Sequence, residues 1–113
     1  MYFPNDENGD ALRQMMKNGD DLSKSRAIDF TVVFRDEPSA REFASHFERN
    51  GFPAKCEFTS ATRGLPWDVV VVKHMVPDHR AIGEFEAELQ ACAGVLGGRN
   101  DGWGCFAQER WIE

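Results

Sequence analysis

Cysteine is sparse in this sequence, and its spacing argues against a metal or redox site. The three cysteines, Cys56, Cys92 and Cys105, lie far apart, and no Cys-x-x-Cys pair occurs. A zinc ribbon and a redox dithiol both depend on such a pair, so neither is expected, and no metal or cofactor is predicted. All three residues fall on apolar segments, which predicts reduced thiols packed in the core and favours a cytoplasmic location.

Long apolar stretches are also missing. The run of four valines at Val69–Val72 is far shorter than the ~20 residues that cross a bilayer. Residues 1–10 are largely polar and acidic, whereas a secretion signal has a basic and then an apolar region. The sequence therefore predicts a cytoplasmic protein that does not bind membranes.

Positive charge is in short supply. The 13 lysines and arginines are outnumbered by 19 aspartates and glutamates, which gives a formal net charge of −6. An acidic surface repels phosphate, so nucleic acid is not the expected partner. A protein with a basic segment is the better electrostatic match, while the sequence gives no indication of oligomeric state.

Catalytic motifs are absent as well. The sequence contains neither a nucleophile elbow nor a phosphate-binding loop, so no catalytic residue is assigned and the protein is not expected to be an enzyme. His74 and His79 could approach each other, but they lack a suitably spaced ligand for a metal. A small enzyme or ligand-binding domain remains the alternative, which a deep pocket joining both histidines to a carboxylate would favour.

Hydrophobic residues make up 42% of the 113 residues, enough to form the core of a single domain spanning residues 1–113. Helical and alternating periodicities then divide the chain into seven elements. Helices are expected at Glu7–Lys17, after an Asp36 cap, and after an Asp78 cap. Strands are expected at Ala27–Arg35, Phe52–Ser60, Trp67–Val76 and Trp103–Glu109.

The order of these elements predicts an α+β fold. After the first helix the order is β-α-β-β-α-β, which is the ferredoxin-like pattern. Right-handed crossovers place two helices on one face of a four-stranded antiparallel sheet, with Ala27–Arg35 and Trp67–Val76 as its central neighbours. Some proteins of this topology bind RNA on sheet aromatics, but Phe30 and Phe34 alternate onto the apolar, core-facing side.

Acidic residues suggest where a basic partner would bind. Glu84 and Glu88 lie four residues apart on the last helix, where their like charges repel each other. This pattern indicates either a solvated helix face or a surface whose charge a basic partner neutralises. We interpret them as electrostatic contacts for a basic segment. Further N-terminal carboxylates could extend this surface: Asp6, Glu7, Asp10, Asp20 and Asp21.

The segment Asn100–Gly104 has a distinctive composition. Asp101-Gly102 is typical of a tight turn, and Gly104 is expected to permit close approach of another backbone segment. Trp103 lies between the two glycines, where it either pins the last strand or forms the centre of a binding surface. Asp101 and Trp103 are therefore added to the candidate partner-binding residues.

The motif Asp101-Gly102-Trp103-Gly104, followed by Phe106, resembles the hallmark of the regulator of ribonuclease activity B (RraB) family. The preceding strand and helix and the N-terminal helix with Asn18-Gly19-Asp20 are also similar, so that the resemblance extends over about residues 6–108.

The resemblance implies a ferredoxin-like fold with an added N-terminal helix and a non-enzymatic role. Proteins of this family bind the arginine-rich C-terminal scaffold of ribonuclease E and reduce RNA cleavage, which suits an acidic domain. This sequence departs from the family pattern after the last strand. It ends at Arg110–Glu113, where family members carry a long acidic tail, so weaker binding to the nuclease or a different partner is also expected.

Overall fold

The computed structural model describes residues 3–108 and contains seven elements. The helices are α1 (Glu7–Lys17), α2 (Glu37–Arg49) and α3 (His79–Gly94), and the strands are β1 (Arg26–Phe34), β2 (Ala54–Phe58), β3 (Trp67–Met75) and β4 (Arg99–Gly104). The strands form one antiparallel sheet in the order β2-β3-β1-β4, so the predicted central pairing of β1 with β3 is confirmed.

Each helix begins at an aspartate that accepts a hydrogen bond from a backbone N–H three residues later. The distances are 2.7 Å for Asp6, 2.9 Å for Asp36 and 2.9 Å for Asp78. These bonds satisfy N–H groups that the first helical turn leaves unpaired. The caps expected at Asp36 and Asp78 are therefore confirmed.

Helices α1 and α2 end where the sequence predicts. Asn18 and Asn50 are their C-caps, and the glycines that follow have positive φ angles of 87° and 90°. Glycine adopts such angles without steric cost and so lets the chain turn away from the helix. Helix α3 ends earlier than expected, at Gly94, and a turn connects it to Gly98.

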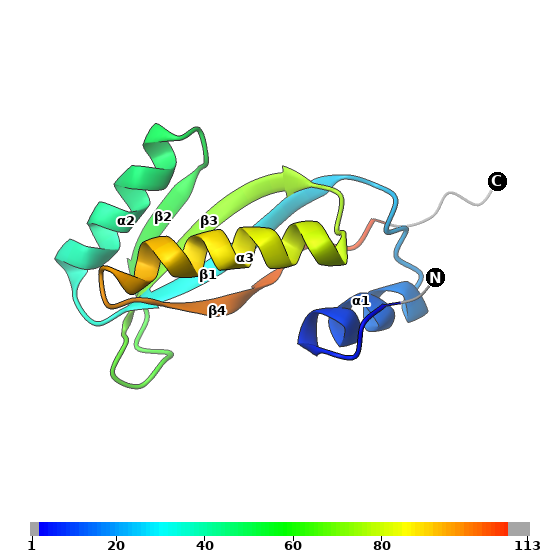
Figure 1. Ribbon diagram of the computed structural model, residues 1–113, viewed down its shortest axis with the longest axis horizontal. Coiled ribbons are helices and arrows are strands. Elements are labelled where there is room, and N and C mark those ends of the chain that lie inside the picture. Colours follow the sequence, from blue (N-terminus) through cyan, green and yellow to red (C-terminus); the bar gives the residue numbers. More distant parts are fainter. Residues whose placement is uncertain (1–2, 109–113) are drawn as a thin grey trace.

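The core lies between one face of the sheet and the two helices α2 and α3 (Figure 1). Alternate residues of β1, from Ile28 to Phe34, point into it and are fully buried. Phe43 and Phe47 of α2 and Phe85 of α3 complete an aromatic cluster with them, in which Phe30 and Phe85 meet edge to face at 4.8 Å. This layered arrangement is the one that the apolar alternation predicts.

Helix α1 lies beyond one end of the sheet, close to the start of α3 (Figure 1). Leu12 is its fully buried anchor, and Gly9 is buried against the preceding segment, where a Cβ atom would lie 1.8 Å from the carbonyl oxygen of Pro4. In residues 3–108 no helix is both long and apolar enough to span a membrane.

The last strand differs from its prediction. Residues 99–104 form β4, whereas 105–108 are not in a strand and Glu109 lies outside the described residues. Asn100-Asp101-Gly102 is therefore not a turn: Asn100 pairs with Val32, and Asp101 and Gly102 oppose a single residue of β1 in a β-bulge. The bulge accommodates the positive φ of Gly102, 107°, within a strand.

Candidate functional site: an acidic cleft between α1, α3 and β4

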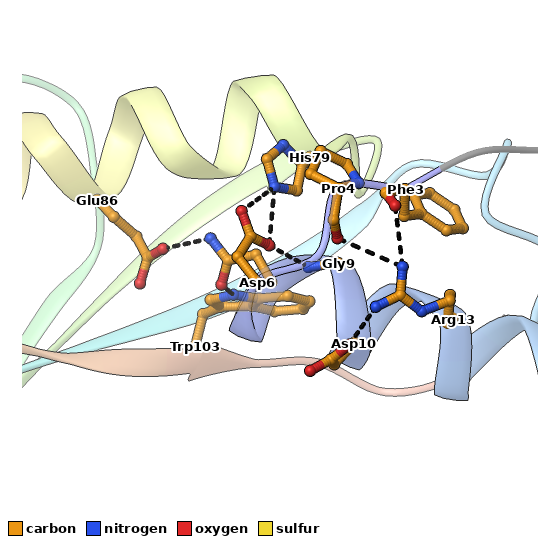
Figure 2. Close-up of polar contacts among 10 residues, drawn as sticks. Phe3, Pro4, Asp6, Gly9, Asp10, Arg13, His79, Glu86 and Trp103 are labelled. Carbon is orange, nitrogen blue, oxygen red and sulfur yellow. Dashed lines mark hydrogen bonds and ion pairs between the residues drawn. The ribbon is translucent and has the colours of Figure 1, made fainter.

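A cleft of about 630 Å³ opens where the first turn of α1 meets α3 and β4. Figure 2 shows Asp6, Glu86 and Trp103, which come from three different parts of the chain, grouped around this turn. The cleft is mostly polar, and its lining residues are Asp6, Glu7, Asn8, Ala11, Glu86, Asn100, Asp101, Gly102 and Trp103.

A chain of hydrogen bonds holds the cleft together. The indole Nε1 of Trp103 donates to Oδ1 of Asn8 at 2.8 Å, and Nδ2 of Asn8 donates to Oε1 of Glu86 at 2.7 Å. The other oxygen of Glu86 accepts from Nδ2 of Asn100 at 2.8 Å. One carboxylate on α3 thus positions side chains from both α1 and β4, and fixes the relative placement of the three walls.

Asp6 has two roles where it lines the cleft. It caps α1, and its carboxylate also lies 2.9 Å from Nε2 of His79 at the start of α3 (Figure 2). The hydrogen bond from the Gly9 backbone, and then the contact with His79, lower the pKa of Asp6 below its ordinary value. The carboxylate is therefore ionised at neutral pH and adds negative charge to the cleft.

The charge of the cleft is only partly compensated. Asp6 faces His79, and Asp101 lies 3.9 Å from Arg99, an exposed pair of little strength. Glu86, by contrast, accepts its two hydrogen bonds from neutral amides, and within residues 3–108 no lysine or arginine lines the cleft. The arrangement can therefore attract a cation from outside the chain.

The family is established by comparison of the sequence with family models. The model described as "RraB: Regulator of ribonuclease activity B" matches residues 5–105. This chain belongs to the RraB family. The match includes α1, the whole sheet and every residue that lines the cleft, so the cleft lies within the part of the chain that defines the family. No curated protein gives a significant match to the chain.

The RraB-like motif forms one wall of the cleft, but its members contribute differently. Trp103 lies on the helix-facing side of β4, is half-buried and packs against the core, so its ring both pins the strand and lines the cleft. Asp101 is exposed at the rim. The prediction that another backbone segment approaches Gly104 closely is wrong, because a Cβ atom there would have no neighbour within 4 Å.

Alanine substitution should change the free energy of unfolding by different amounts at the two glycines of the RraB motif. Gly102→Ala should lower the free energy of unfolding by about 1–2 kcal/mol, because residues with a Cβ disfavour its positive φ. Gly104→Ala, which meets open space, should change it by less than about 0.5 kcal/mol. Urea denaturation of the two variants provides the measurement, and equal losses would contradict the assigned bulge.

Glu84 and Glu88, the other sequence-predicted contacts, lie outside the cleft on the exposed side of α3. Glu84 pairs with Arg80 at 2.9 Å, in an exposed i, i+4 arrangement. The glutamate between them, Glu86, is the one that enters the cleft. Sequence reasoning missed its role, and also those of Asn8 and Asn100, because their partners are far apart in the chain and no local pattern signals them.

Asp20 does not extend the acidic surface, contrary to expectation. It is buried and lies 2.7 Å from Nη1 of Arg26, which is buried as well. The same guanidinium donates to the carbonyl oxygens of Asp21 and Lys24, and Asp20 accepts from the backbone N–H of Gln108. This ion pair is therefore a structural clamp that joins β1 to the residues before it, 20–24, and to Gln108 in the segment after β4.

The two histidines named for an enzymatic alternative have different partners. His74 contacts the hydroxyl of Ser25 at 3.1 Å, while His79 contacts Asp6, and neither lines the cleft. Within residues 3–108 no group of three or more potential ligands is arranged to hold a metal ion. The pocket that would favour this alternative is thus not formed by these residues.

The three cysteines are free and half-buried, and they pack against the core, in agreement with the expected reduced thiols. Burial raises the pKa of the Cys56 and Cys105 thiols, which makes thiolate chemistry less accessible.

The aromatic side of β1 faces inward, since Phe30 and Phe34 are fully buried. These residues therefore offer no platform for stacked RNA bases, as the sequence indicated.

Proposed function

We propose that this protein is a non-enzymatic regulator of a ribonuclease, and that it acts by binding a basic segment of ribonuclease E. The family match over residues 5–105 is the observation that carries this proposal, because the family is described as regulating ribonuclease activity. The net charge of −6 and the carboxylates of the cleft support a basic protein partner over nucleic acid.

The finer structural and cellular assignments are part of the same proposal. The strand order β2-β3-β1-β4, with α2 and α3 packed against one face, supports a ferredoxin-like class with α1 added. We place the protein in the cytoplasm and treat residues 1–113 as one domain. The expected departure from the family pattern concerns Arg110–Glu113, and these residues lie outside the described part of the chain.

Binding is proposed to involve both the cleft and the neighbouring exposed side of α3. Glu84 and Glu88 would contribute at long range, whereas Asp101 and Trp103 at the cleft would contact the partner directly. Exposed charges of this kind mainly accelerate association and make affinity depend on salt.

Charge reversal on α3 tests the partner surface. The double variant Glu84→Lys/Glu88→Lys should bind the purified ribonuclease E scaffold about tenfold more weakly at low salt, because it replaces attraction by repulsion. Isothermal titration calorimetry at low and moderate salt measures the effect. The fold should persist, since both side chains are exposed.

The matched control reverses two exposed glutamates of α2, Glu42→Lys/Glu48→Lys, and therefore makes the same change in net charge. This control should retain most of the affinity. Equal losses in the two double variants would show that net charge alone drives binding, and unchanged affinity in the α3 variant would remove Glu84 and Glu88 from the interface.

A further inference from the structure

We propose that the cleft between α1, α3 and β4 holds one arginine side chain of the basic partner segment, with Glu86 and Trp103 as its principal contacts. This inference rests on the proposed function and assigns the chemical group that the cleft recognises. The cleft volume of about 630 Å³ leaves room for such a side chain and its connecting backbone. Two observations on the lining residues, together with the geometry of the guanidinium, support arginine.

Glu86 provides the negative charge for this site. Each of its oxygens accepts one hydrogen bond from a neutral amide, at 2.7 Å from Asn8 and 2.8 Å from Asn100. A carboxylate oxygen can accept a second bond, and no cation in residues 3–108 is paired with Glu86. A guanidinium could therefore bind this carboxylate without displacing the bonds that hold the cleft together.

Trp103 provides an aromatic wall. Its indole N–H is already directed to Asn8 at 2.8 Å, which fixes the orientation of the ring where it lines the cleft. Planar guanidinium groups stack on tryptophan more favourably than on other side chains, and the attraction increases where water is excluded. A fixed ring loses little conformational entropy when the partner binds.

The geometry of the guanidinium favours arginine over lysine at this carboxylate. Arginine has five N–H donors in a planar fork, enough to bind both oxygens of Glu86 at once, whereas a lysine ammonium has three around a single atom. Bidentate pairing of this kind is stronger and more specific in geometry than a single charged contact.

The test uses a defined probe, the acetylated and amidated peptide Gly-Arg-Gly-Ser-Arg-Gly-Ser-Arg-Gly, and its counterpart with lysine in place of arginine. The full chain, labelled with ¹⁵N, is titrated with each peptide, and the indole N–H resonance of Trp103 is followed by NMR. The arginine peptide should shift this resonance saturably and bind more tightly than the lysine peptide. An unchanged indole resonance at saturation would overturn the proposal.

Glu86→Gln removes the charge but keeps the size of the side chain. This variant should bind the arginine peptide about tenfold more weakly, in line with the loss of a charge-assisted hydrogen bond. Glu48→Gln, an exposed position on α2, makes the same charge change and should bind like the unmodified protein. Equal affinities of Glu86→Gln and Glu48→Gln would overturn the proposal.

Glu86→Gln also disturbs the hydrogen bonds to Asn8 and Asn100, so a second variant guards against misfolding. Asp101→Asn lies at the exposed rim and should weaken arginine binding about threefold while leaving the fold intact. If Glu86→Gln does not fold, an unchanged affinity in Asp101→Asn rejects the arginine site.

The two proposals fail in different ways. Suppose that the ribonuclease E scaffold binds, that Glu84→Lys/Glu88→Lys weakens this binding, and that Glu86→Gln and Asp101→Asn do not. The regulator assignment then stands and the arginine cleft is rejected. If the scaffold does not bind but the arginine peptide binds in a Glu86-dependent manner, the cleft stands and ribonuclease E is rejected as the partner.

Discussion

Replacing Arg26 with methionine is expected to lower the free energy of unfolding by about 3–5 kcal/mol. The substitution leaves the buried carboxylate of Asp20 without its cation, and removes the hydrogen bonds that Arg26 donates to the carbonyl oxygens of Asp21 and Lys24. Those backbone oxygens then have to find other donors or move into solvent. Urea denaturation monitored by circular dichroism measures the loss.

Two further variants distinguish the buried charge from other effects of losing an arginine. Arg41→Met breaks an exposed pair with Glu37 and should cost less than about 1 kcal/mol. The double variant Arg26→Met/Asp20→Leu should recover part of the stability, because no unpaired charge remains buried. A loss at Arg26 no larger than that at Arg41 would contradict the clamp described above.

Replacing Gly98 with alanine should destabilise the protein by about 1–3 kcal/mol, the range found when extra volume is forced into a packed core. A Cβ atom at this position would lie 2.3 Å from Cε1 of Phe34. Phe34 is fully buried and packs against Phe43 with ring centroids 5.0 Å apart, so it has little room to move. The backbone between α3 and β4 would have to shift instead.

Gly83→Ala is the matched control for Gly98→Ala. Gly83 lies inside α3, and a Cβ atom there would have no neighbour within 4 Å. Alanine has the higher helix propensity, so this substitution should stabilise the protein by about 0.5–1 kcal/mol. Thermal unfolding should therefore shift in opposite directions for the two variants, and a loss of stability in both would contradict the packing assigned to Gly98.

Features set by neighbouring residues could be predicted from the sequence. Asp36 and Asp78 cap helices because their side chains reach an N–H group three residues away. The alternation from Ile28 to Phe34 indicates a buried strand face, since successive side chains point to opposite sides of a sheet. The central pairing of β1 with β3 followed from the order of elements and is also confirmed.

Features set by contacts between distant residues could not be predicted in this way. Asp101-Gly102 is typical of a turn, but pairing with β1 draws it into a bulged strand. Asp20 was interpreted as a surface carboxylate, although Arg26 holds it in the interior. The network of Glu86 with Asn8 and Asn100 joins three elements and leaves no local pattern in the sequence.

The most direct test of the central claim is the rate at which full-length ribonuclease E cleaves an RNA substrate, with and without a molar excess of this protein. The same assay with ribonuclease E lacking its C-terminal scaffold is the control. We expect slower cleavage by the full-length enzyme and an unchanged rate for the truncated one. An unchanged rate for the full-length enzyme would contradict the account, and equal slowing of both forms would indicate that the protein acts on the RNA or on the catalytic domain instead.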